Sequence, residues 1–460
     1  MKIIRFFLIF LVCGSLLPSL GFAGTAHYVD ANAAGGGDGS WDRPFKNIAE
    51  VNAHSFSNGD DVYFKYGQTF TTTSRLNIDW QGTSGDHVTV GCYDGKNDFN
   101  CSGKTRPTID GQSRTYPGNE SGIVKVNGFD YVDLEYLHVY NVDGYGIEYD
   151  NQADYGSITN CYVQNITRQG ILVSRSSNVE VTYNTVERSS YSNTIWAAIE
   201  ITGMSYEGWA QNNAARHNIV FHCGEGIGTY KGARYTTIEY NTVYDCKSYH
   251  IYVANARDAT IRYNLVYETN EQLPGDGRDL LIGTDSEGHV SSIIKVTGNV
   301  EIYGNKVAGG SSGIALMSNS NDIGVYQSNN KIYQNIIVDC NKNFYFERPV
   351  DGWTGNRIYD NISMTKSAES VHANLYSPPG VTWGRNYFDD PVGGNAGDKA
   401  IVGVVLAKQS GWRSLPAGEV NESFFSLTDG ASSELMLIFK EDGSVNGALS
   451  PPMGLKIKVE

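Results

Sequence analysis

The chain has 460 residues and a net charge of −15; 18% of its residues are charged, 12% are aromatic and 40% are hydrophobic. The aromatic and hydrophobic content excludes a disordered chain. The negative charge and the lack of a long basic stripe argue against a protein that follows nucleic-acid phosphates. Fifty-two glycines and 30 tyrosines, with abundant Asn, Thr, Ser, Ile and Val, are typical of strands and turns rather than helices.

The chain begins with the features of a secretory signal peptide. Lys2 and Arg5 accompany an apolar run, and small residues follow it, so cleavage is expected after Ala23 or Ala26. The alternative is an uncleaved membrane anchor; elsewhere no run reaches the ~18 apolar residues that a membrane helix needs. Removal of residues 1–23 would change the charge from −15 to −17. We therefore expect a secreted, periplasmic or cell-surface protein that does not insert into a membrane after cleavage.

Two features precede the central part of the chain. Residues 44–54 form a short stretch with helical character, and Pro44 suits a first helical turn, so we expect an N-terminal cap helix there. Cys92 and Cys101 bracket a turn-rich segment and could close a small loop, which an exported protein permits. No Cys-x-x-Cys or His-rich spacing supports a structural zinc site.

A six-residue word recurs through the middle of the chain: Ile or Val, two residues, Asn, one residue, then Val or Ile. Its clearest copies begin at Val181, Ile238 and Ile261. A second strand-like word, such as Gly170-Ile-Leu-Val173, follows most copies. With looser copies included, the word begins at 134, 158, 181, 215, 238, 261, 302, 332 and 358. The base period is therefore about 23 residues, with insertions at three places.

The two words predict a stacked β solenoid. Each word is a short alternating strand with one apolar face, and a unit of two or three such strands cannot bury that face alone. Stacking the units at ~4.8 Å would create in-register parallel sheets around a continuous core. A helical solenoid is excluded because no window has a sustained 3.6-residue apolar stripe, and leucine-rich repeats are disfavoured because Leu does not recur.

One register position of the repeat is occupied by asparagine in seven units. An aligned column of asparagines can hydrogen-bond along a stack, although a ligand-binding stripe is the alternative. Cys223, Cys246 and Cys340 each follow a ladder Asn by five residues, either as inward-facing thiols or with Cys223 and Cys246 paired. The pairing of Cys161 is left open. The predicted ladder consists of Asn184, Asn218, Asn241, Asn264, Asn305, Asn335 and Asn361.

These words resemble those of right-handed parallel β-helix repeat proteins. The start of the chain is similar too, with Tyr28-Val-Asp30, Gly59 to Phe64 and Arg106 to Gly111. The resemblance covers about residues 27–390 and implies an all-β, single-stranded right-handed parallel β-helix over 24–390. Residues 391–460 would form a C-terminal β cap or small appendage. The superfamily includes pectate and alginate lyases, uronan epimerases, polygalacturonases and secreted proteins without an assigned role, so it is specific for fold rather than activity.

Ligands of such a fold lie along an outer sheet face. Strand alternation leaves a column of residues outward, from Glu148 through Leu172, Glu200 and Gly228 to Tyr252. Insertions beside this column contain aromatic and charged residues. Residues expected to bind substrate are Glu200, Glu225, Tyr230, Tyr252, Trp196 and Trp209, and those expected to be catalytic are Lys231, His250, Tyr249 and Arg175.

The site favours a secreted carbohydrate-active protein that cleaves or epimerises a polysaccharide. A uronate lyase or epimerase needs a base and a cation beside the sugar carboxylate, which these residues could supply. Aromatic rings suit sugar faces, and carboxylates suit hydroxyls or a bridging Ca²⁺ ion. The alternatives are a glycoside hydrolase using Glu200 and Glu225, a non-catalytic glycan-binding protein, and a merely solvated outer face. The signature motifs of alginate epimerases, polygalacturonases and pectate lyases are absent, and the oligomeric state is left open.

Overall fold

The computed structural model describes most of the chain up to residue 400. The predicted signal peptide, and the predicted C-terminal segment apart from 399–400, lie outside the described residues. The described residues are 24–72, 74–113, 122–190, 196–204, 208–268, 280–286, 296–318, 326–338, 340–349, 352–364, 371–374, 378–384, 386–388 and 399–400.

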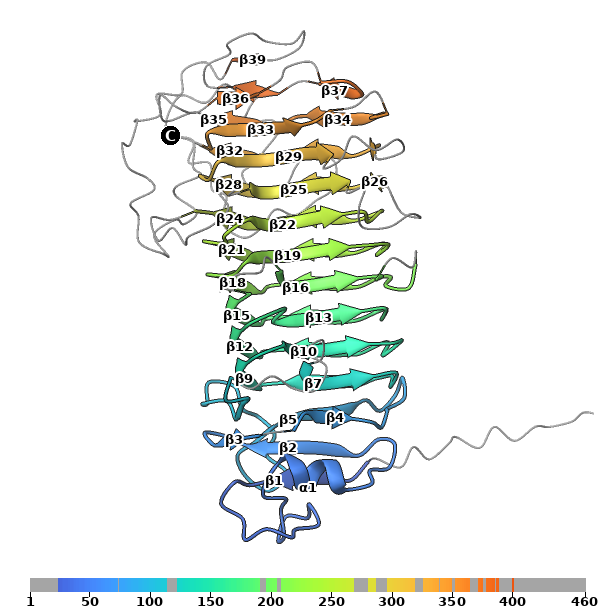
Figure 1. Cartoon of the computed structure of the whole chain (residues 1–460), viewed down its shortest axis with the longest axis vertical. Helices are drawn as coiled ribbons and strands as arrows, with labels where there is room; N and C mark the ends of the chain where they lie inside the picture. The colour runs from blue at the N-terminus through green and yellow to red at the C-terminus, as the bar shows by residue number, and fades with distance from the viewer. Residues whose placement is uncertain are drawn as a thin grey trace, which may run out of the picture.

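The chain winds into a long coil in which each lap adds one strand to each of three parallel sheets (Figure 1). Sheet 1 contains β1 (Ala26–Val29), β2 (Asp61–Lys65), β5 (Val88–Tyr93), β8 (Val132–Glu135), β11 (Ser157–Thr159), β14 (Glu180–Thr182), β17 (Ala214–Arg216), β20 (Thr237–Glu239), β23 (Thr260–Arg262), β27 (Glu301–Tyr303), β31 (Lys331–Tyr333), β34 (Asn356–Tyr359) and β37 (Val381–Trp383). Sheet 2 contains β3 (Thr69–Thr71), β6 (Thr108–Asp110), β9 (His138–Val142), β12 (Tyr162–Ile166), β15 (Thr185–Ser189), β18 (Ile219–Phe221), β21 (Thr242–Tyr244), β24 (Leu265–Tyr267), β28 (Lys306–Ala308), β32 (Ile336–Val338), β35 (Ile362–Met364), β38 (Tyr387–Phe388) and β39 (Lys399–Ala400).

Sheet 3 carries the candidate site and is formed by the longest strands of most laps. It contains β4 (Leu76–Ile78), β7 (Gly122–Asn127), β10 (Tyr145–Asp150), β13 (Ile171–Ser174), β16 (Ala197–Thr202), β19 (Glu225–Tyr230), β22 (Tyr249–Ala254), β25 (Leu280–Ser286), β29 (Ser312–Ser318), β33 (Lys342–Glu347) and β36 (Val371–Ala373). A small two-stranded sheet is formed by β26 (Val296–Gly298) and β30 (Tyr326–Ser328). The predicted all-β parallel solenoid is confirmed.

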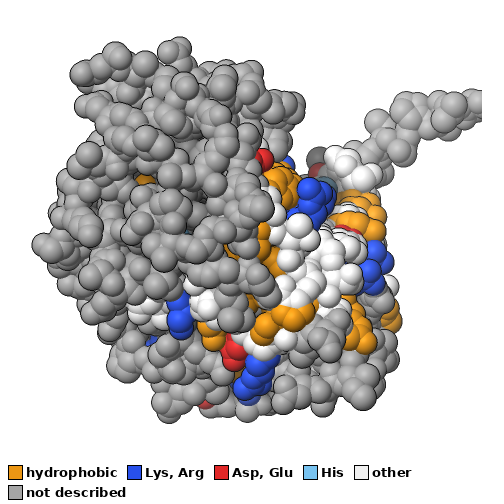
Figure 2. Space-filling model, turned by 90° about the horizontal axis from the view of Figure 1, so that it is seen from above, with side chains coloured by type: hydrophobic (Ala, Val, Ile, Leu, Met, Phe, Trp, Pro, Cys, Tyr) orange, Lys and Arg blue, Asp and Glu red, His pale blue; other side chains and the backbone are white. Residues whose placement is uncertain are grey.

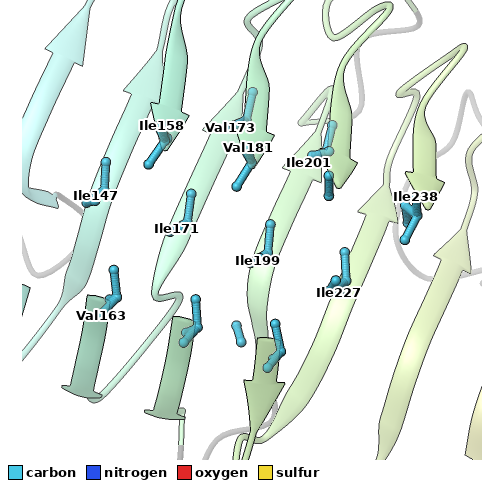
Figure 3. Close-up of a cluster of buried hydrophobic side chains, with 14 of the residues drawn as sticks. Ile147, Ile158, Val163, Ile171, Val173, Val181, Ile199, Ile201, Ile227 and Ile238 are labelled. Carbon is cyan, nitrogen blue, oxygen red and sulfur yellow. The ribbon is translucent and has the colours of Figure 1, made fainter. Parts of the chain in front are cut away.

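The core consists of aligned β-branched side chains that repeat once per lap. In sheet 3, Ile147, Ile171, Ile199 and Ile227 lie in register and are buried (Figure 3). Val181 and Ile238 come from sheet 1, so the rows of two sheets face one interior. Side chains of this type fit a pleated surface well, and stacking them removes from water an apolar face that no single lap could bury.

The asparagine ladder is confirmed along its whole predicted length. Each ladder side chain donates through Nδ2 to Oδ1 of the next, at 2.9–3.0 Å from Asn184 to Asn361, and the row continues to Asn386. Each Oδ1 along this row also accepts the backbone N–H of the preceding ladder residue, as in Asn218 N to Asn241 Oδ1 at 2.9 Å. The ladder residues are buried, so the ligand-stripe alternative is wrong and the structural interpretation holds.

The six cysteines that the structure describes separate into one disulfide and four buried thiols. Cys92 and Cys101 form a disulfide with a Cα–Cα distance of 6.1 Å, as the turn-rich segment suggested. Cys161, Cys223, Cys246 and Cys340 are free and buried, so Cys223 and Cys246 are inward-facing thiols rather than a pair.

A helix, α1 (Ile48–Ala53), lies within the predicted 44–54 stretch. It is drawn beside β1 at the N-terminal end of the coil in Figure 1, and it buries Ile48 and Val51 in the core. A capping role for α1 stays a prediction. Viewed along the coil in Figure 2, basic side chains are scattered among hydrophobic and uncharged ones on the described surface, and they form no continuous stripe there.

Candidate functional site

The register of sheet 3 aligns the residues that were predicted to face outward. Glu148 pairs with Leu172, Leu172 with Glu200, Glu200 with Gly228, and Gly228 with Tyr252. Their chain neighbours on both sides point into the core. We call this outer surface of β10, β13, β16, β19 and β22 the sheet 3 face.

Glu200 is a carboxyl held in a desolvated position on this face. The residue is only 5% exposed, although it points away from the core. Gln169 Nε2 donates a hydrogen bond of 2.7 Å to Glu200 Oε2. Burial raises the pKa of Glu200, and the opposing effects of the Gln169 hydrogen bond and the Lys231 charge are smaller. A carboxyl with a raised pKa keeps its proton closer to neutral pH, which suits a proton donor.

Glu225, at the start of β19, belongs to an aromatic network. The Tyr230 hydroxyl donates to the Glu225 carboxylate, and the Tyr230 ring meets the Tyr252 ring edge-on with centroids 5.5 Å apart. Tyr252 stacks on Tyr249 at 3.9 Å, and its hydroxyl donates to Asp285 Oδ2 at 2.8 Å. Three tyrosines thus connect two carboxylates. All three are buried, so a ligand reaches these rings only if the face opens.

The cations on and beside the sheet 3 face differ in whether they are paired with a carboxylate; Lys125 belongs to the adjacent strand β7. Arg175 binds Asp150 through two hydrogen bonds of 2.7 and 3.0 Å, and Lys125 Nζ lies 3.2 Å from Glu148 Oε2. Within the part of the chain that the structure describes, Lys231 has no carboxylate within 4.0 Å. Among the described cations of this face, Lys231 can therefore meet a substrate anion without first leaving a partner carboxylate.

The expectation that His250 faces the groove is wrong. The residue is 0% exposed and its side chain points into the interior. Its Nε2 lies 2.9 Å from Glu268 Oε1 and accepts the backbone N–H of Cys246 at 3.2 Å. The reason is a break in alternation where each lap enters sheet 3, because two successive residues point inward there: Ala198 with Ile199, His250 with Ile251, and Leu281 with Ile282.

The two tryptophans predicted to bind substrate occupy the segments that flank β16. Trp196 precedes β16 and is partly buried; its carbonyl oxygen accepts the Glu225 N–H at 3.0 Å. Trp209 lies between β16 and β17 and is 43% exposed. Other aromatic and charged residues of the insertions beside the outward column lie outside the described residues: Tyr191, Tyr206, Glu207, Asp276, Arg278, Asp279, Glu287 and His289.

Sequence reasoning missed two residues of the face. Asp150 follows Glu148 by two positions, so one more step of the alternation would have found it. Gln169 lies 31 residues before Glu200, and no periodic signal links them, because an insertion separates the two laps.

The described residues contain no cluster of three or more His, Cys, Asp or Glu side chains that could hold a metal ion. They also contain no helix that is long and apolar enough to cross a membrane.

Comparisons with known proteins bear on the fold. The family described as "right handed beta helix region" matches residues 197–327. No curated protein matches the sequence. Similar solved structures include the lacto-N-biosidase of family GH136 from Eubacterium ramulus, at 15% identity and a TM-score of 0.59, over 79% of this chain and 68% of that one.

Two further structures have other activities in their names. A mannuronic acid-specific family 6 polysaccharide lyase from human gut microbiota has 14% identity and a TM-score of 0.51, over 82% of this chain and 92% of its own. The A-module of the mannuronan C-5 epimerase AlgE4 from Azotobacter vinelandii has 16% identity and a TM-score of 0.50, over 77% and 99%. The protein is therefore a right-handed parallel β-helix, as the repeat words indicated. At these identities the likeness extends to the fold alone, and the three named activities differ.

Proposed function

We propose that this chain is a carbohydrate-active enzyme that cleaves a polysaccharide bound along the sheet 3 face, with Glu200 as its proton donor. The observation that carries the proposal is the desolvated Glu200 carboxyl on an outer sheet face, where burial raises its pKa. Proteins of similar fold are named as a lacto-N-biosidase, a mannuronan C-5 epimerase and a polysaccharide lyase, which supports a polysaccharide as the ligand.

Hydrolysis fits the described side chains better than the uronate lyase or epimerase chemistry expected from the sequence. Of the four residues expected to supply the base and the cation, His250 lies inside the coil and Arg175 is bound to Asp150. Glu200 and Glu225 are two carboxyls in different surroundings, and a glycosidase uses such a pair. In this assignment Glu200 protonates the glycosidic oxygen, and Glu225 acts as the base or nucleophile.

Lys231 supports a second candidate, elimination from an acidic sugar. It follows β19 directly, acts electrostatically on Glu200, and is partly exposed. An ammonium group there could neutralise a sugar carboxylate, with Tyr249 or Lys231 as base and Glu200 protonating the leaving oxygen. A bridging Ca²⁺ ion stays part of this second candidate only, since a chain of net charge −15 repels a polyanion.

A panel of neutral and acidic polysaccharides tests the proposal. Products are measured both as new reducing ends and as the ultraviolet absorbance of an unsaturated uronate, with and without chelator. Hydrolysis gives reducing ends alone, and elimination gives both. Glu200→Gln should lower kcat by roughly 10²–10⁴-fold, because the amide cannot donate the acid's proton.

The matched control is Glu187→Gln, the same change on the outer face of sheet 2, where Glu187 accepts a hydrogen bond from Gln164 at 2.9 Å. This variant should keep the wild-type rate. Equal rates for Glu200→Gln and wild type would remove Glu200 from the mechanism. Binding of a glycan without any cleavage would favour the non-catalytic alternative.

Export is part of the proposal. The charged and apolar residues of 1–23 and the Cys92–Cys101 disulfide support it, since disulfides persist in oxidising compartments. Mass spectrometry of the protein recovered outside the cytoplasm should give an N-terminus following Ala23 or Ala26. A full-length N-terminus would contradict cleavage.

A further inference from the structure

Gly228 occupies the outward position of β19 beside Glu200, where a side chain would be expected. The Tyr230 ring fills that space: a Cβ atom built on Gly228 would lie 2.1 Å from Tyr230 Cε2 and 2.4 Å from the hydroxyl oxygen. The ring therefore lies flat along its own strand, and the hydroxyl reaches Glu225 at the other end of β19. Gly228 has no left-handed backbone angle, so side-chain space rather than conformation accounts for the glycine.

We propose that Tyr230 is a positioning residue that holds Glu225 ionised for catalysis. Because Gly228 has no side chain, the Tyr230 ring can occupy the position from which its hydroxyl reaches Glu225. The inference rests on the proposed function, because it assigns the second carboxyl of the same site. A phenolic hydroxyl that donates to a carboxylate stabilises the charged form. Gln169 donates to Glu200 in the same way, but at Glu200 the effect of burial outweighs that hydrogen bond and raises the pKa.

The arrangement separates the two carboxyls by function. The titratable groups on the strands that flank β19 are Glu200 on β16, and Tyr249, His250 and Tyr252 on β22, of which His250 points into the interior; Lys231 follows β19 itself. The Tyr252 hydroxyl donates to Asp285, and the Tyr230 hydroxyl donates to Glu225. An acid and a base with opposite charge states at one pH are what hydrolysis of a glycosidic bond requires.

A double-mutant cycle tests the bond without needing a substrate. Tyr230→Phe, Glu225→Gln and the double variant are unfolded in urea at neutral pH and at about pH 3, below the ordinary pKa of a glutamate. At neutral pH the two single effects should be coupled by on the order of tenfold in the unfolding equilibrium constant. At about pH 3 the coupling should be clearly smaller than at neutral pH, because part of Glu225 is then protonated and a neutral carboxyl gains less from the Tyr230 hydroxyl.

Gly228→Ala provides an independent way to break the hydrogen bond between Tyr230 and Glu225. The new methyl group displaces the Tyr230 ring, so adding Tyr230→Phe to Gly228→Ala should change stability little. The matched control is Tyr162→Phe, which removes a phenol–carboxylate bond to Glu187 on sheet 2 and should be additive with Glu225→Gln. The absence of coupling at neutral pH, or equal coupling at both pH values, would overturn the proposal.

In the active enzyme, Tyr230→Phe should move the acidic limb of the kcat profile upward by about one pH unit and leave KM nearly unchanged. An unmoved acidic limb would count against the positioning role. If Glu200→Gln leaves cleavage intact while the coupling is present, the role of Glu200 as proton donor fails and the Tyr230–Glu225 assignment stands. If Glu200→Gln abolishes cleavage and no coupling is found, the assignment of Tyr230 fails alone.

Discussion

Replacing one ladder asparagine should cost several times more stability than replacing an exposed one. The side chain of Asn241 makes four hydrogen bonds: Nδ2 donates to Ala215 O at 2.9 Å and to Asn264 Oδ1 at 3.0 Å, and Oδ1 accepts from Asn218 N at 2.9 Å and Asn218 Nδ2 at 3.0 Å. At roughly 1 kcal/mol for each hydrogen bond, Asn241→Ala should lower the free energy of unfolding by about 4 kcal/mol.

The measurement is equilibrium unfolding in urea, followed by circular dichroism. The control is Asn32→Ala: Asn32 is exposed, and its backbone rather than its side chain forms its hydrogen bond to Asp30. Asn32→Ala should change stability by no more than about 0.5 kcal/mol. If the free energies of unfolding of the two variants lie within about 1 kcal/mol of each other, the ladder does not stabilise the coil through these hydrogen bonds.

Two further predictions concern the N-terminal laps. The Cys92–Cys101 disulfide joins residues nine positions apart, so its reduction should lower the free energy of unfolding by about 2.5 kcal/mol through the loss of loop-closure entropy. In the same urea assay, a Cys92→Ser/Cys101→Ser variant should be insensitive to reductant. Burial raises the pKa of Asp61 from 3.8 to about 6, so the folded state holds this proton more tightly than the unfolded state. Stability should therefore fall as pH rises from about 4 to about 6, and Asp61→Asn should remove that part of the pH dependence; an unchanged pH profile of the urea midpoint would contradict the assignment.

The fold could be predicted because equivalent residues recur along the sequence, and their spacing shows which residues of successive laps lie side by side. A residue such as Asn241 has a counterpart at the same position in the laps above and below, so the spacing of Asn218, Asn241 and Asn264 already defines which atoms meet. Aligned amides can satisfy one another only if the laps are stacked in parallel, and this excludes most other arrangements. The outward column from Glu148 to Tyr252 followed from the same register.

The candidate site was harder to predict because it depends on departures from the repeat. Period-two alternation fails at His250, where the chain turns into sheet 3. Its neighbours one lap before and after are Gly226 and Leu281, and a column of glycine and leucine was a sign of an interior position. The contact of Gln169 with Glu200 crosses an insertion, so no fixed spacing could reveal it.

Two glutamates at equivalent kinds of position show how a structural carboxyl differs from a candidate catalytic one. Glu239 faces outward from sheet 1 and lies between two arginines: Arg216 Nε is 2.6 Å from one carboxylate oxygen, and Arg262 binds the other. Burial alone would raise the pKa of Glu239, but hydrogen bonds from Arg262 and Arg216 outweigh burial and lower it. Glu200 has the same small exposed fraction on sheet 3, but its partners are the Gln169 amide and the more distant Lys231. Their effects are smaller than that of burial, so the pKa of Glu200 rises. A carboxylate held between two arginines stabilises neighbouring laps and cannot give up a proton at neutral pH, whereas a carboxyl without them can. This contrast directs the search for chemistry to sheet 3 rather than to the charged rows of sheet 1.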